Sequence, residues 1–199
     1  PPPPHAPLLA GKQIAIARDA AFCFLYPANL EWLTEQGATL HFFSPLAGEP
    51  LPTAADALWL PGGYPELYAA PLSHSKSWPS LRQAVHAALP VLAECGGMMA
   101  LGESLTDHAG NRWPMAGLLP IHTRMTGRLA SLGYRQEISG VRGHEFHHSV
   151  RDASPLEPAF QVERGDAGLR HLQLRASYIH WYFPSQPATV ARWFSNNVG

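Results

Sequence analysis

Short apolar runs in the first half of the chain alternate with segments of helical spacing. The apolar, β-prone runs predict strands at residues 13–17, 39–43, 57–60 and 91–93. Helical spacing predicts helices at residues 29–36 and 80–88. Parallel strands need crossover connections, so this alternation predicts an α/β fold with a mostly parallel sheet flanked by helices. Sites in such sheets lie at the carboxyl ends of the strands.

The pattern becomes irregular after about residue 113. Short β-prone pieces at residues 127–138 and 168–175 predict antiparallel additions in the C-terminal half, and residues 161–170 read as a surface hairpin or loop. At the other end, prolines fill residues 1–4 and recur at Pro7, which favours an extended conformation. We therefore expect an interdomain linker over residues 1–10 and one domain over residues 11–199.

The composition of the chain limits the classes of partner that we expect it to bind. The formal net charge is −1 and the pI about 7.0, so the chain lacks the basic field that holds a phosphate backbone, and we expect no nucleic acid. No apolar run is long enough for a membrane span and no secretory signal is evident, so we expect a cytoplasmic protein without a membrane partner. The two cysteines, Cys23 and Cys95, are interpreted as free thiols, with Cys23 a small core hydrophobe.

Cys95 lies in the most informative segment, residues 90–102. A short apolar strand leads into the cysteine, two glycines follow, and a helix-compatible run comes next. A nucleophile elbow has this arrangement, and the helix N-terminus would lower the pKa of the thiol. The alternative is a buried structural cysteine beside a glycine turn.

Two further segments fit a thiol nucleophile. Gly62 and Gly63 close another strand, where a backbone N–H could join that of Gly96 in holding an oxyanion; an ordinary turn is the alternative. Near the end of the chain, His180 stands alone in an apolar aromatic stretch, residues 176–183. Its imidazole suits a base that takes a thiol proton and returns it to a leaving amine, although a core histidine is the alternative.

The order of these segments resembles the class I glutamine amidotransferase family. The finer spelling resembles its cobyrinate a,c-diamide synthase branch. The motifs that carry this resemblance are residues 60–66 (LPGGYPE), 93–97 (AECGG), 132–135 (LGYR), 142–147 (RGHEFH) and 177–180 (SYIH).

The resemblance implies a three-layer, flavodoxin-like fold, with Cys95 as nucleophile and His180 as base. It implies oxyanion or glutamine binding by Gly62, Gly63 and Gly96. We expect Tyr64, His144 and Glu145 to line the pocket or orient His180.

Three positions depart from the wider class. Tyr182 stands where that class usually carries a glutamate two residues after the histidine, so Glu145 is considered as a substitute acid. Met99 replaces a usual glutamine, and Tyr64 a frequent proline.

By resemblance, the chain hydrolyses glutamine and supplies ammonia to an N-terminal synthetase domain of the same polypeptide. That domain would bind ATP and Mg²⁺ and amidate the a and c carboxylates of cobyrinate or hydrogenobyrinate. No phosphate-binding Gly-x-x-x-x-Gly-Lys motif occurs in this chain, so we expect no cofactor here. The histidines near Glu145 lack a zinc-site spacing, so no metal is expected either.

Three alternatives remain, and a homodimer is left open. The chain could serve amidation of another tetrapyrrole such as nickel sirohydrochlorin, be a different elbow-cysteine hydrolase of the same fold, or be a non-catalytic binding domain.

Overall fold

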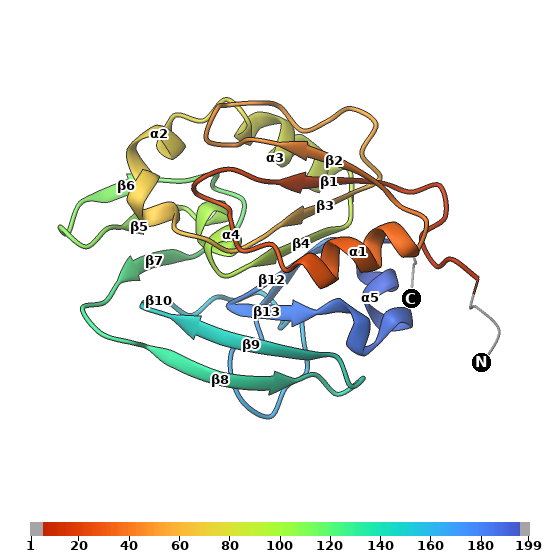
Figure 1. The fold of residues 1–199 in the computed structure, drawn as a ribbon. Coiled ribbons are helices and arrows are strands. Elements are labelled where there is room, and N and C mark those ends of the chain that lie inside the picture. Colours follow the sequence, from red (N-terminus) through yellow and green to blue (C-terminus); the bar gives the residue numbers. More distant parts are fainter. Residues whose placement is uncertain (1–5, 196–199) are drawn as a thin grey trace.

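A six-stranded sheet forms the centre of the molecule (Figure 1). The computed structural model describes residues 6–195. The strand order is β11-β12-β4-β3-β1-β2, and all neighbours are parallel except β11 and β12. The strands are β1 (Gln13–Ala17), β2 (Thr39–Phe43), β3 (Ala57–Leu60), β4 (Val91–Glu94), β11 (Leu169–His171) and β12 (Leu174–Ser177). The predicted α/β fold with a mostly parallel sheet is confirmed, and the four expected strands lie where the apolar runs placed them.

Helices cover both faces of this sheet. Side chains alternate along each strand: Ala15 and Ala17 of β1 pack into one buried cluster, and Ile14 and Ile16 into another. The first cluster also contains side chains of α2, α3 and α4, and the second those of α1 and α5. These helices are α1 (Pro27–Glu35), α2 (Ala69–Ser73), α3 (Trp78–His86), α4 (Gly96–Leu101) and α5 (Pro187–Trp193), and the short 3₁₀ turns are η1 (Pro65–Tyr68) and η2 (Phe183–Ser185). The result is three layers.

Two smaller sheets follow in the C-terminal half, as expected for additions to the parallel core. Their orders are β10-β7-β5-β6 and β13-β9-β8. The strands are β5 (Ser104–Thr106), β6 (Arg112–Pro114), β7 (His122–Met125), β8 (Ser131–Gln136), β9 (Arg142–His147), β10 (Ser149–Arg151) and β13 (Ile179–Tyr182). Figure 1 shows the second of these sheets beside the main sheet, with β13 next to β12.

Part of the second half behaves differently from the expectation of antiparallel additions. β12 pairs with β4 in parallel, so residues 174–177 extend the main sheet instead of a separate antiparallel one. The apolar side chains of Leu174 and Ala176 are buried there, in the same core cluster as those of β4 residues Val91 and Ala93, and this burial favours the position in the main sheet.

The start of the described chain already packs on the domain. Leu9 is buried in the cluster with α1, and its N–H donates to the carbonyl of Gln36 at 2.8 Å. The domain therefore includes residues that the sequence assigned to a linker, and the linker prediction at residues 1–5 lies outside the described residues. Among residues 6–195, no helix is long and apolar enough to cross a bilayer.

Candidate active site

Cys95 occupies the turn between β4 and α4. Its backbone has φ 49° and ψ −110°, a conformation that non-glycine residues seldom adopt and that strand-to-helix elbows hold under strain. The turn is tight: a Cβ added to Gly97 would lie 2.1 Å from the carbonyl oxygen of Leu60, at the end of β3. The Cys95 N–H also donates to the carbonyl of Ser177 at 2.8 Å. The elbow is thus pressed between the ends of β3 and β12.

The thiol of Cys95 is buried. Its pKa is raised to about 12: burial is the largest cause, the amide of Gly96 opposes it, and the carboxylates of Glu66, Glu94 and Glu145 add to the rise. The sequence-based expectation of a lowered pKa is therefore wrong for the free site. The cost of burying a thiolate outweighs the favourable end of a helix only six residues long.

The two glycine turns meet beside this thiol. A Cβ on Gly96 would lie 3.1 Å from the amide nitrogen of Gly63, so the backbones after β3 and β4 touch. The next amide, that of Tyr64, instead donates to the carbonyl of Ala21 at 2.9 Å. The structure thus brings the backbone of Gly63 and that of Gly96 to one place, next to Cys95.

His180, on β13, lies against Gly62 in the glycine turn that touches the elbow. A Cβ on Gly62 would lie 2.3 Å from its Cε1 atom, and the ring of Phe24 meets the imidazole edge-on at 5.7 Å between centroids. Tyr64, which is partly exposed, packs beside Phe24 at 5.2 Å between ring centroids. The imidazole of His180 therefore packs against Gly62, the residue that precedes Gly63.

The pKa of His180 is lowered to about 4. Burial is the largest cause, charge on His144 and His147 acts in the same direction, and Glu145 opposes them. His144 is the backbone partner of His180 across β9 and β13, which accounts for its influence. Near pH 7 the imidazole of His180 is neutral and can accept a proton.

Glu145 is buried but turned to other partners. It accepts hydrogen bonds from Arg135 Nε at 3.1 Å and the Asp166 amide at 2.9 Å, and it contacts His147 Nε2 at 2.7 Å. Burial would raise its pKa, but these hydrogen bonds prevail and bring it to about 2. Among the described residues, no hydrogen bond joins Glu145 to His180, which corrects the suggestion that it directly replaces a triad acid. Its side chain is saturated by the network behind the site.

Two residues near the site were missed by sequence reasoning. Glu94 and Asn29 are buried, and both hydrogen-bond to the backbone beside His180. A carboxylate that ends the apolar strand 91–93 was the available signal for Glu94. Asn29 gave no such signal, because asparagine at a helix start is common. Cys23, expected in the core, is exposed, because its apolar neighbour Phe22 takes the buried position.

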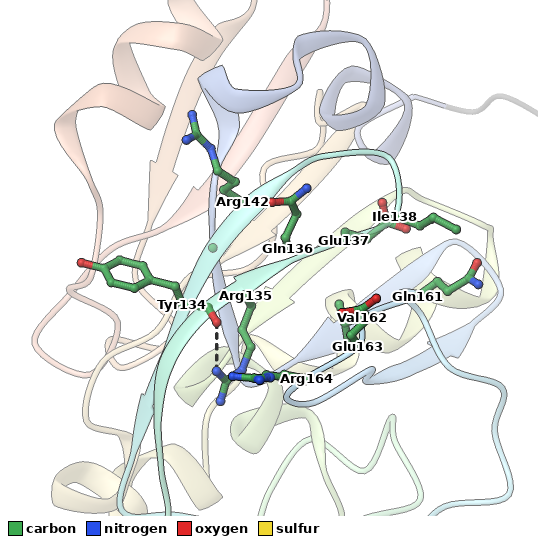
Figure 2. Close-up of a pocket in the computed structure, with 11 residues that line it drawn as sticks. Tyr134, Arg135, Gln136, Glu137, Ile138, Arg142, Gln161, Val162, Glu163 and Arg164 are labelled. Atoms are coloured by element: carbon green, nitrogen blue, oxygen red, sulfur yellow. Dashed lines mark hydrogen bonds between the residues drawn. The ribbon is translucent and has the colours of Figure 1, made fainter.

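A separate cavity of about 800 Å³ lies between the β8–β9 hairpin and the loop before β11 (Figure 2). Neither Cys95 nor His180 lines it. Figure 2 shows Arg142 and Gln136 on one side and Arg135 with Arg164 on another, among the sticks drawn. Within residues 6–195 there is no group of three or more His, Cys, Asp or Glu side chains placed to hold a metal ion.

Comparison with known proteins identifies the family. Residues 13–188 match the model of the CobB/CobQ-like glutamine amidotransferase domain. The chain belongs to this family. It is 49% identical to a cobyrinate a,c-diamide synthase of Herminiimonas arsenicoxydans, over 96% of this chain and 46% of that protein. It is also 49% identical to a hydrogenobyrinate a,c-diamide synthase of Stutzerimonas stutzeri, over 94% of this chain and 45% of that protein.

The fold of this amidotransferase domain recurs in solved structures. One glutamine amidotransferase aligns with a TM-score of 0.63 at 16% identity, covering 90% of this chain and 96% of that one. Another, from Thermotoga maritima, aligns with a TM-score of 0.58 at 14% identity, covering 85% and 75% of the two chains. The chain spans about half the length of the curated relatives it matches.

Proposed function

We propose that this domain hydrolyses glutamine with Cys95 as nucleophile and His180 as base. The observation that carries the proposal is the packing of His180 on Gly62. The next residue, Gly63, touches Gly96, which directly follows Cys95, so the packing brings the proposed base to the turn beside the elbow. A histidine that served only as core packing would not need to lie at this glycine turn. The contact of Gly63 with Gly96, next to Cys95, and the contact of His180 with Gly62 support this assignment.

The chemistry begins from two neutral groups. Since burial raises the pKa of Cys95 and lowers that of His180, the thiol keeps its proton until an acceptor and an electrophile are both in place. As sulfur bonds to the glutamine side-chain carbon, the proton passes to His180, and the amides of Gly63 and Gly96 stabilise the oxyanion.

The second half of the reaction returns the site to its starting state. His180 gives its proton to the nitrogen as the carbon–nitrogen bond breaks, and ammonia leaves behind a glutamyl thioester. Water then attacks this thioester while His180 takes its proton. Glutamate departs when the carbon–sulfur bond breaks, and the thiol of Cys95 regains the proton.

The ammonia is proposed to serve the reaction for which the relatives are named. A synthetase half in the same polypeptide would use ATP and Mg²⁺ to activate the a and c carboxylates of cobyrinate or hydrogenobyrinate, which ammonia then amidates. The length of the relatives, about twice that of this chain, supports such a second half. A cytoplasmic location, where glutamine and ATP are available, fits this reaction.

Glutamate release by the full-length protein, supplied with acceptor and ATP, tests the glutaminase proposal. Wild type should release glutamate, and His180→Ala should reduce the rate by a factor of about 10³ or more, since triad bases contribute on this scale. Retention of wild-type glutamate release in His180→Ala would reject His180 as the base.

A further inference from the structure

Among residues 6–195, the strand that carries His180 has a strand partner on one edge only. β13 pairs with β9 on one side, where His180 lies opposite His144. On the other side, side chains satisfy its backbone: the Ile179 amide donates to Ser177 Oγ at 3.0 Å, and the Trp181 amide donates to Glu94 Oε2 at 2.7 Å. The peptide groups on both sides of His180 are therefore held by side chains.

Asn29 completes this edge from α1. Its Nδ2 donates to the carbonyl of Trp181 at 2.8 Å, and its Oδ1 accepts the amide of Phe183 at 2.9 Å. These bonds imitate the ladder that a neighbouring strand would supply. They fix the end of β13 after the histidine.

Glu94 differs from the other members of this edge in its place in the chain. It is the last residue of β4 and directly precedes the nucleophile Cys95. Its second oxygen accepts the indole N–H of Trp59 at 2.8 Å, and only 2% of the residue is exposed. A buried carboxyl group is costly unless its oxygens are hydrogen-bonded, so a residue of this kind is retained where its bonds are needed.

Two hydrogen bonds tie residues beside His180 to the end of β4 that carries Cys95. The Cys95 amide donates a hydrogen bond to the carbonyl of Ser177. Glu94, which precedes Cys95, accepts a hydrogen bond from the amide of Trp181, which follows His180. The first bond joins β4 to β12, and the second joins β4 to β13, so a shift of β13 relative to β4 would break the bond between the Trp181 amide and Glu94. Sub-ångström placement of a base relative to a nucleophile is worth large factors in rate.

The other acids near the histidine do not perform this task. Glu145 is bonded to Arg135, His147 and the Asp166 amide, and the residue two positions after His180 is a half-exposed tyrosine.

We propose that Glu94 is the positioning residue for His180, acting through the Trp181 amide to set the imidazole over Cys95. This inference rests on the proposed glutaminase function. Glu94 hydrogen-bonds to the backbone beside His180 and not to the imidazole ring, so its loss should displace the base without altering glutamine recognition. We therefore expect its loss to lower kcat for glutamine hydrolysis and to leave KM unchanged.

The test compares Glu94→Ala, Glu94→Gln and Val190→Ala in the full-length protein. Val190 is a matched control: it is buried in the same cluster as Trp59, yet it makes none of the hydrogen bonds at the edge of β13. Glutamate release gives kcat and KM, ammonia-dependent amidation reports on the synthetase half, and thermal melting reports on folding.

Glu94→Ala should lower kcat for glutamate release about 100-fold, with KM for glutamine within about threefold of wild type. Glu94→Gln should recover part of that loss, to within about tenfold of wild type, because its side-chain oxygen can still accept the Trp181 amide. Val190→Ala should lower the melting temperature while kcat stays within about threefold. Ammonia-dependent amidation should be unchanged in all three.

Three results would overturn the inference. These are a Glu94→Ala kcat within about threefold of wild type, a loss confined to KM, or an equal kcat loss in a Val190→Ala protein of equal melting temperature. Cys95→Ala and His180→Ala run in parallel separate this failure from failure of the proposed function. If those two variants are inactive while Glu94→Ala is active, only the positioning role is wrong; if they still release glutamate, the glutaminase assignment itself fails.

Discussion

Replacement of Gly62 by alanine is a steric test of the base that keeps the side chains of Cys95 and His180 chemically unchanged. The φ angle of Gly62 is not positive, so alanine can adopt its backbone conformation without strain. The added Cβ would lie 2.3 Å from Cε1 of His180 and 3.1 Å from Nδ1. Carbon atoms in contact prefer about 3.5 to 4.0 Å. The imidazole must therefore retreat by about 1 Å or more.

That displacement sets the expected magnitude. A 1 Å error in the position of a reacting group can cost a factor of about 100 in rate, so Gly62→Ala should lower kcat for glutamate release about 100-fold. Stability should fall by about 1 to 3 kcal/mol, because the new methyl overpacks a filled site. Ammonia-dependent amidation by the full-length protein should be unchanged.

Gly127→Ala is the matched control, because nothing lies within 4 Å of a Cβ at that position. It should keep full glutaminase activity. Steady-state glutamate release and thermal melting of the two variants decide the matter. A folded Gly62→Ala protein with kcat within about threefold of wild type would refute the argument that His180 acts from its place against Gly62.

Three further predictions concern titration and the choice of residues. Burial raises the pKa of Glu94 from its ordinary 4.5 to about 8, so its contribution to stability is complete below about pH 4.5 and disappears as pH rises through about 8. In urea unfolding, the free energy of unfolding of wild type should fall between about pH 7 and pH 9 by about 1.4 kcal/mol more than that of Glu94→Gln; equal slopes would contradict this pKa. The exposed Cys23 should react first with a thiol reagent, whereas the buried, protonated Cys95 should react slowly near pH 7, and Cys23→Ser should keep glutaminase activity. Tyr182→Phe should cost far less activity than His180→Ala, since the half-exposed Tyr182 side chain makes no hydrogen bond to His180 among residues 6–195; equal losses would reject the view that Tyr182 is dispensable.

The parallel core could be predicted from sequence because its signals are local. Strand β3, for example, is a buried apolar run stopped by Pro61 and Gly62, and the structure begins and ends it where the pattern did. The elbow at Cys95 was equally readable, since two glycines after a strand leave few other conformations. These elements depend on neighbours within a few residues.

Other features depend on contacts that the sequence does not encode locally. The pairing of β12 with β4 joins segments more than 80 residues apart, and so does the hydrogen bond from the Trp181 amide to Glu94. The raised pKa of Cys95 comes from burial by the whole fold, so the helix terminus alone gave the wrong direction. Of the partners of Glu145, His147 lies two residues away on the same strand, but Arg135 and the Asp166 amide come from other segments that no local spacing connects to it.

The central claim, that Cys95 supplies ammonia by hydrolysing glutamine, is tested most directly by one comparison in the full-length protein. Amidation of the proposed tetrapyrrole acceptor is measured for Cys95→Ala with glutamine and, separately, with added ammonia. We expect loss of glutamine-dependent amidation and wild-type rates with ammonia, because only ammonia supply requires the thiol. Glutamine-dependent amidation at the wild-type rate, or failure of ammonia to restore amidation in a folded variant, would contradict it.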